Sequence, residues 1–304
     1  MFQFPDVRVG DPVGHGRVRV FPLFRDRQAG GQDYVLADQA MRDGSVDVTE
    51  VSDAGSVPEL QVENRLDRDV LFLEGEELHG AKQHRVLNTS VLVGAGKTAR
   101  LPVSCVEAGR WHHESKRFGH RGLHSHPKLR HHLKKGSADS IKRIGRHESD
   151  QHAIWEEIRS THDQLHTPST TGSLHDSHAA QAQRIEDIRK DLAHVEGAHG
   201  MAVAVGGRLT CMDLFDRPET MRKVWRRILS GPVLQSLASG TEEDPEPEKD
   251  LVGDLLAELR GRMEHPERAV LVEGSYKPAE ILSILALLDV AVSSRLHMLI
   301  LAST

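Results

Sequence analysis

Apolar and polar residues alternate with a period of two over much of residues 15–105, which is the pattern of half-buried β-strands. The clearest runs lie at residues 17–20, 46–51, 60–63, 70–73, 86–93 and 99–106. Turn-forming residues follow several of them, for example after Asp53, Asn64 and Gly94. Six short strands with this spacing predict an antiparallel sheet that forms a sandwich or a barrel-like structure.

The apolar period changes to that of a helix farther along the chain. Ile154, Ile158 and Leu165 share one helical face, so residues 150–165 are predicted to be helical. A second helix is predicted at residues 179–195, and a loop at residues 167–177 lies between the two. Two apolar runs at 201–205 and 209–214 flank a Gly-Gly pair and predict a β-hairpin. A helix at 218–229 follows, for which Asp216 is the expected N-cap.

Residues 236–250 are acidic and rich in proline, which predicts a linker. The pattern after it alternates helices (251–263, 278–288 and 295–302) with strands (269–272 and 290–293). We therefore expect an α+β protein in which a β-rich domain over residues 1–240 precedes a small, partial Rossmann-like α/β segment over residues 251–304.

Composition narrows the functional classes. The net charge of −6 and the aromatic content of 4% disfavour a general nucleic-acid surface. The first ten residues do not resemble a signal peptide, and the longest apolar stretch, 281–292, is broken by Ser283 and Asp289, so we expect no membrane span. With only Cys105 and Cys211, the chain fits a reducing compartment, and we expect it in the cytoplasm.

Histidine is concentrated in one region of the chain. Fifteen of the 20 histidines lie between His112 and His199, many of them in a basic insert at residues 111–152. The pairs His120/His124 and His162/His166 have the i, i+4 spacing of helical zinc ligands. No cysteine pair and no His-Glu-x-x-His motif accompanies them, so we predict a variable, solvated loop with neither a metal nor another cofactor. A helix is expected from about Lys128.

Three unusual strings resemble the ARG and Rhodanese-Phosphatase-superfamily-associated protein domain over about residues 1–240. They are Leu73-Glu-Gly-Glu-Glu-Leu-His-Gly-Ala-Lys-Gln-His-Arg-Val-Leu-Asn, Leu101-Pro-Val-Ser-Cys-Val-Glu-Ala-Gly-Arg-Trp, and Ala202-Val-Ala-Val-Gly-Gly-Arg-Leu with the following Asp213-Leu-Phe-Asp. The family name implies an association with ADP-ribosylglycohydrolase and phosphatase-like partners. It implies no particular reaction.

The first of these strings holds carboxylates that would repel one another unless a metal, Lys82 or Arg85 neutralised them. We hypothesise that Glu74 or Glu76 and Gln83 face a polar ligand and that Arg85 grips its phosphate or carboxylate in a bidentate fork. The alternative is a solvated hairpin end in which Arg85 forms an ordinary ion pair.

In the second string, Cys105 and Glu107 lie two residues apart and therefore on one side of a strand. Cys105 is a candidate nucleophile and Glu107 its candidate partner, with His112 and His113 as candidate bases. The alternative is a buried structural cysteine. Trp111 is expected to be a packing residue.

Residues 250–304 are similar to a segment of the polysaccharide pyruvyl transferase family, through Asp289-Val-Ala-Val-Ser-Ser-Arg-Leu-His-Met-Leu. The resemblance implies that Arg295 and His297 face phosphoenolpyruvate. The N-terminus of the predicted helix at Arg295 also favours an anion, and His297 is a candidate proton donor. The segment corresponds to part of one half of that family's two-half fold.

Three functions remain open. The first is an accessory domain that binds a small anionic or phosphorylated ligand, linked to ADP-ribose or phosphoester metabolism. The second is a transferase that uses phosphoenolpyruvate, which is the class expected if the protein is an enzyme. The third is an interaction protein with a protein partner or a second copy of itself.

Overall fold

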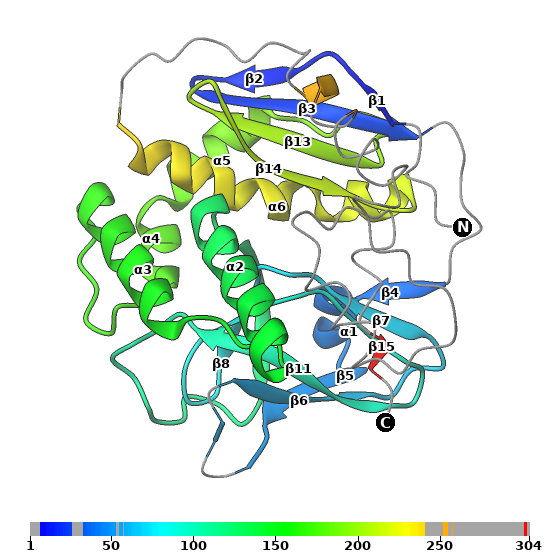
Figure 1. Ribbon diagram of the computed structural model, residues 1–304, viewed down its shortest axis with the longest axis vertical. Coiled ribbons are helices and arrows are strands. Elements are labelled where there is room, and N and C mark those ends of the chain that lie inside the picture. The colour runs from blue at the N-terminus through cyan, green and yellow to red at the C-terminus, as the bar shows by residue number, and fades with distance from the viewer. Residues whose placement is uncertain are drawn as a thin grey trace.

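The computed structural model describes residues 7–25, 33–52, 55–56, 58–240, 252–254, 257 and 301–302. In this part of the chain the strands form three sheets. Helices occupy the space between one sheet, at the top of Figure 1, and the other two, at the bottom. The structure is a mixed α+β fold with mainly antiparallel sheets, as the alternating pattern predicts.

The first sheet joins the N-terminal strands to the hairpin at residues 200–214. Its order is β1 (Val7–Val9), β3 (Val18–Arg25), β13 (Gly200–Val205) and β14 (Arg208–Leu214), and β2 (Val13–His15) also pairs with β3. All of these pairs are antiparallel. The sheet is buried on both faces: Val20 and Val203 face the helices, whereas Phe21 and Ala202 join a separate apolar cluster with Val252. Burial on both faces explains why β13 is apolar without interruption.

The second sheet has the order β15 (Leu301–Ala302), β10 (Val91–Val93), β7 (Asp69–Phe72) and β4 (Tyr34–Leu36). The third has six strands: β12 (Phe118–His124), β8 (Glu76–Gly80), β9 (Arg85–Leu87), β11 (Thr98–Cys105), β6 (Glu59–Asn64) and β5 (Val46–Glu50). This third sheet curls, so that its two edge strands come close together, and Arg117 beside β12 reaches Asp47 of β5 at 2.8 Å. An apolar cluster fills its interior, with α1 (Ala37–Arg42) packed against it.

The long helix α6 (Pro218–Ala238) is central to the helical layer. Trp225 is fully buried, and its Nε1 donates a hydrogen bond to the Leu192 carbonyl at 2.8 Å. Gly231 allows close approach, because a Cβ there would lie 2.4 Å from the Ser125 carbonyl oxygen. The other helices of this layer are α2 (Pro127–Ile144), α3 (Gln151–Leu165), α4 (Leu174–Ala180) and α5 (Ala182–Asp191).

The Gly-Gly hairpin between β13 and β14 is confirmed. Gly206 and Gly207 have φ angles of 58° and 74°, the left-handed conformation that a two-residue hairpin turn requires at both positions.

The predicted strand at 86–93 is wrong in one respect, because it is two strands that belong to different sheets. The break occurs at Asn88, whose side-chain amide donates to the His147 carbonyl at 2.8 Å and accepts from the Ser104 hydroxyl at 2.7 Å. These long-range hydrogen bonds turn the chain where the local pattern continues.

The prediction of a solvated loop is wrong for residues 118–126, whereas the helix expected from about Lys128 is confirmed as α2. This region forms β12 and α2, and β12 pairs with β8. His124 and His126 are 1% exposed, and burial lowers the pKa of both, so their imidazoles are neutral and buried. A polar composition is therefore no sign of a loop in this region.

Two helical boundaries differ from those predicted. The helix expected at 179–195 is the pair α4 and α5, and α4 begins inside the predicted loop. Helix α6 continues past residue 229, through Pro232 and into the first residues of the predicted linker. Arg217, not Asp216, is its N-cap residue, because the Asp216 carboxylate instead accepts a hydrogen bond from the Tyr34 hydroxyl at 2.8 Å.

Most of residues 251–304 lies outside the described residues, including the predicted strands at 269–272 and 290–293. Residues 252–254 are helical, as predicted. Leu301–Ala302 form β15, parallel to β10, where the pattern predicts a helix. The edge of β10 offers unpaired backbone groups, which favour strand pairing over a local helix.

Candidate functional site

The first of the three strings, which begins at Leu73, lies inside the protein: every residue from 74 to 85 is buried. The alternative of a solvated hairpin end is therefore wrong. β8 and β9 occupy the inner part of the third sheet, between β12 and β11. The charged side chains of this segment must find partners inside the protein, because an unpaired buried charge is costly.

Glu74 and Glu76 find partners on the helices and not on Lys82 or Arg85. Glu74 accepts hydrogen bonds from Arg130 of α2 at 2.8–3.3 Å. Burial alone would raise the pKa of Glu74, but the charges of Arg130 and Lys134 outweigh it and lower the pKa. Glu76 lies 2.6 Å from Arg227 of α6. Burial nevertheless raises the pKa of Glu76 to about 7. The two carboxylates thus fasten helices to the sheet.

A polar layer closes one end of the curled third sheet. Glu50 follows Val46 and Val48 on the inner face of β5, Arg85 shares the inner face of β9 with Leu87, and Cys105 follows Leu101 and Val103 on β11. Arg85 and Cys105 are directly opposite each other in the β9–β11 register. The interior of the sheet therefore changes from apolar to polar at this end.

The Arg85 site consists of this layer and its surroundings: Glu50, Lys82, Gln83, Arg85, Cys105 and Trp111. Arg85 is completely buried. Its Nη1 donates to Gln83 Oε1 at 2.8 Å and to Cys105 Sγ at 2.6 Å. Its Nη2 lies 3.8 Å from Glu50 Oε1. Among the described residues, neither Arg85 Nε and Nη2 nor the two carboxylate oxygens of Glu50 make a hydrogen bond.

Trp111 covers this site from the solvent side. Its side chain is 47% exposed, whereas the Arg85 Cζ lies 5.6 Å and the Lys82 Nζ 5.5 Å from its ring centroid. Two cations therefore face one indole ring, which stabilises their charge. Trp111 is therefore partly exposed and contacts two cations, in addition to the packing role that the sequence predicts.

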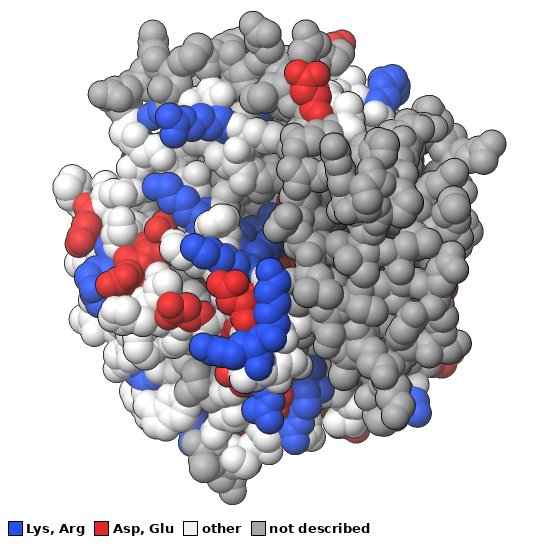
Figure 2. Space-filling model, viewed as in Figure 1, with Lys and Arg blue, Asp and Glu red and all other residues white. Residues whose placement is uncertain are grey.

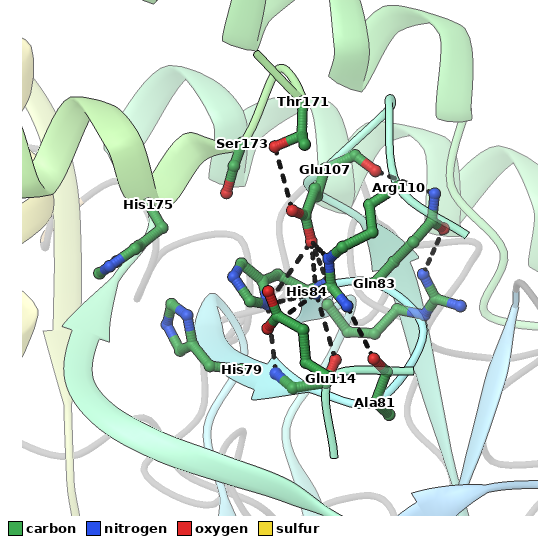
Figure 3. Close-up of polar contacts among 12 residues, drawn as sticks. His79, Ala81, Gln83, His84, Glu107, Arg110, Glu114, Thr171, Ser173 and His175 are labelled. Carbon is green, nitrogen blue, oxygen red and sulfur yellow. Dashed lines mark hydrogen bonds and ion pairs between the residues drawn. The ribbon is translucent and has the colours of Figure 1, made fainter. Parts of the chain in front are cut away.

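A second polar network adjoins the Arg85 site and is drawn in Figure 3. Arg110 donates to Glu107 Oε2 at 2.8 Å from Nε and to the Ala81 carbonyl at 2.7 Å from Nη1. Glu107 also accepts from Thr171 at 3.0 Å and from the His84 main chain at 3.1 Å. Gln83 connects the two sites, because its Nε2 donates to the Glu107 carbonyl at 2.9 Å.

The histidine cluster, His79, His84 and His175, lies beside this network, as Figure 3 shows. The ring centroids are 4.7 Å apart for His79–His84, 4.9 Å for His79–His175 and 6.0 Å for His84–His175. Burial lowers the pKa of all three imidazoles. In His84, Nδ1 faces the Gly80 N–H and the Arg110 guanidinium, which can only donate, so the ring hydrogen belongs on Nε2.

No three His, Cys, Asp or Glu side chains in the described ranges are grouped as a metal site. The two spaced pairs do not act as helical ligand pairs. His120 and His124 belong to a strand, and His162 Nε2 lies 2.9 Å from the Ser173 carbonyl oxygen, to which it can donate.

Cys105 and Glu107 do not face each other as a nucleophile and its partner. Cys105 contacts Arg85 and Gln83, while Glu107 contacts Arg110. Burial raises the pKa of the Cys105 thiol to about 11, which disfavours the thiolate that a nucleophile needs. Their catalytic roles stay predictions, and the geometry favours structural ones.

Arg295 and His297 lie outside the described residues, so the phosphoenolpyruvate site stays a prediction without structural support. Among the described residues, Glu50 and Arg110 are site residues that the sequence analysis missed. Glu50 ends an alternating strand and resembles a solvated terminal residue, and Arg110 stands in the second string without a recognisable partner.

Figure 2 shows one face of the molecule, on which basic and acidic side chains are intermixed over the helices. The described part of this face has no extended field of a single sign. Among the described helices, none has an apolar stretch sufficient to cross a bilayer.

One family model matches the chain over residues 6–280, and its description is ARG and Rhodanese-Phosphatase-superfamily-associated Protein domain. The match includes both strings that build the Arg85 site and ends before Arg295. No curated protein and no solved structure matches the chain.

Proposed function

The chain belongs to the ARG and Rhodanese-Phosphatase-superfamily-associated protein family, and we propose that it is an accessory domain that binds a small phosphorylated ligand at the Arg85 site. The family name supports a ligand from ADP-ribose or phosphoester metabolism. The domain would hold such a ligand for a partner enzyme.

The observation that carries this proposal is the unused hydrogen-bonding capacity of Arg85. Its guanidinium is fully buried, yet Nε and Nη2 make no hydrogen bond within the described part of the chain. Buried polar groups are normally satisfied, so an orphaned pair of donors marks a position for a missing acceptor. Two donors on one edge of a guanidinium match two oxygens of a phosphate or carboxylate.

The rest of the site suits the same ligand. Gln83 and Cys105 hold Nη1 and so fix the orientation of the guanidinium before a ligand arrives. Lys82 adds a second positive charge near Trp111. The exposed indole is able to move aside or to stack on a planar ring of the ligand.

Glu74 and Glu76 do not belong to this ligand site in the proposal, because Glu74 is hydrogen-bonded to Arg130 and Glu76 is ion-paired with Arg227 at 2.6 Å. Arg85 keeps the role that the sequence analysis predicts, whereas Gln83 orients Arg85 and does not itself face the ligand. The transferase alternative gains no observation in its favour, and binding of a protein partner or a second copy stays a prediction.

Thermal unfolding with ADP-ribose tests the proposal. A ligand at 100 times its dissociation constant adds about 2.7 kcal/mol to the free energy of unfolding, which raises the melting temperature by several degrees. We expect this shift in the native protein, its loss in Arg85→Lys, and its reduction in Trp111→Ala. The lysine keeps the charge but loses the bidentate fork.

Two exposed positions provide matched controls. Arg208→Lys on β14 and Ile144→Ala on α2 change an exposed arginine and an exposed large apolar side chain that are not among the residues of the Arg85 site, and both should keep the full shift. A folded Arg85→Lys protein with undiminished ADP-ribose affinity would show that the ligand binds elsewhere. The absence of any shift would favour the interaction protein.

A further inference from the structure

Glu50 is the second unsatisfied group of the Arg85 site, and its chemistry is opposite to that of Arg85. The side chain is 5% exposed, and neither carboxylate oxygen makes a hydrogen bond among the described residues. Arg85 is the cation paired with it, and its Nη2 lies 3.8 Å from Oε1, beyond hydrogen-bonding distance.

This pairing is incomplete on both sides. An ion pair at hydrogen-bonding distance would satisfy one donor of Arg85 and one acceptor of Glu50, whereas the observed separation satisfies neither. Cys105 and Gln83 hold the guanidinium by its other edge, so it is not drawn closer to Glu50. The site therefore presents two donors and two acceptors next to each other.

From this arrangement we infer that the ligand is a sugar phosphate, whose phosphate oxygens accept from Arg85 and whose hydroxyl groups donate to Glu50. A free phosphate satisfies only the donors, and the charge of Glu50 opposes it. A sugar with two adjacent hydroxyls next to its phosphate satisfies both groups at once. A carboxylate that accepts from ribose hydroxyls is an established device of nucleotide sites.

Glu50 is thus the residue that determines specificity, and it selects against inorganic phosphate and pyrophosphate. The inference rests on the proposed function, because it needs a phosphate at Arg85. It goes further by naming the sugar as the second recognised group and Glu50 as the residue that recognises it.

Calorimetric titration of the full chain with three probes tests this inference. We expect ribose 5-phosphate to bind more tightly than 2-deoxyribose 5-phosphate, and both to bind more tightly than inorganic pyrophosphate. In Glu50→Gln, ribose 5-phosphate should lose about 10- to 100-fold in affinity, the worth of a hydrogen bond to a charged group. Pyrophosphate should gain affinity in the same variant, because the opposing charge is gone.

Glu63→Gln is the matched control. Glu63 lies on the adjacent strand β6 with its side chain 53% exposed and paired to Arg65, so its replacement should change neither affinity. If Glu50→Gln does not fold, Glu50→Asp keeps the charge and should still reject pyrophosphate while it binds ribose 5-phosphate less well.

The outcomes separate the two proposals. If the native protein binds all three probes alike, or if Glu50→Gln binds ribose 5-phosphate as well as the native protein does, Glu50 does not recognise a sugar and the inference is overturned while the phosphate site stands. If neither the native protein nor Glu50→Gln binds any probe, the proposed function itself fails. Opposite changes for ribose 5-phosphate and pyrophosphate in Glu50→Gln support the inference.

Discussion

The guanidinium of Arg130 holds the carboxylate of Asp213 through two hydrogen bonds, 2.9 Å from Nη1 to Oδ2 and 2.7 Å from Nη2 to Oδ1. The same guanidinium binds Glu74. One buried arginine on α2 thereby joins β14 of the first sheet to the segment that precedes β8 of the third. Burial alone would lower the pKa of Arg130, but the two carboxylates raise it well above its usual value.

Loss of Arg130 should therefore destabilise the protein strongly. Arg130→Met removes the cation that two buried carboxylates share and leaves Glu74 with Lys134 alone, 3.5 Å away. Breaking a buried ion pair from one side costs about 3–5 kcal/mol. Urea denaturation should show this loss as a lower midpoint with an unchanged slope. Arg208→Met, at an exposed position of β14, should cost far less. Equal midpoints for the two variants would mean that the contacts of Arg130 with Glu74 and Asp213 contribute little to stability.

Glu76 should make stability fall as the pH rises towards neutrality. Burial raises its pKa from 4.5 in the unfolded chain to about 7, although Arg227 opposes this shift. The folded protein then keeps a proton that the unfolded chain has lost, so the contribution to stability is complete below pH 4.5 and is lost as the pH rises through 7. The expected slope is about 1.4 kcal/mol for each pH unit.

Comparison of the native protein with Glu76→Gln isolates this effect. The glutamine does not titrate, so the free energy of unfolding of the native protein should decline more steeply than that of the variant between pH 5 and pH 7. Parallel curves would show that Arg227 keeps Glu76 ionised throughout this range.

Buried histidines should make the protein sensitive to acid. Burial lowers the pKa of His126 from 6.5 to about 3. The unfolded chain binds the proton first, so the stability that neutral His126 contributes is present above pH 6.5 and is lost as the pH falls towards 3. His126→Asn keeps an N-cap for α2, where the His126 side chain accepts from the Leu129 N–H.

The measurement is the free energy of unfolding at pH 7, 6 and 5 for the native protein and for His126→Asn. The variant should lose less stability on acidification, by about 1.4 kcal/mol for each pH unit at most. His152→Asn, at an exposed position of α3, should leave the slope unchanged. Identical slopes for the native protein and His126→Asn would place a proton on His126 in the folded state.

Both cysteines should resist alkylation in the folded protein. Burial raises the pKa of Cys105 to about 11 and that of Cys211 to about 12, and only the thiolate reacts at a useful rate. Mass spectrometry after iodoacetamide at pH 8 should find little modification in buffer and complete modification in urea. Rapid and selective alkylation of Cys105 would contradict its structural role and restore it as a candidate nucleophile.

Local sequence patterns were sufficient for much of the fold. Strand alternation places residues 46–51, 60–63 and 99–106 correctly, and the Gly-Gly pair predicts the hairpin, because both signals depend on neighbours within a few residues. The same patterns fail at β8 and β12, whose residues are charged or rich in histidine. A strand with buried polar side chains lacks the alternating apolar pattern, so it is not predicted when the partners of those side chains are distant in the sequence.

Gln83, Arg85, Cys105 and Glu107 can be singled out from the amino-acid sequence, since they stand in two unusual strings. Which of them are in contact depends on the folded arrangement of the strands and helices. Strand pairing places Arg85 opposite Cys105, and the curl of the third sheet places Glu50 near Arg85. Helices α2 and α6 provide the cations that pair with Glu74 and Glu76. The physical reason is that a buried charge is stabilised by any group within a few ångströms, whatever its distance along the chain.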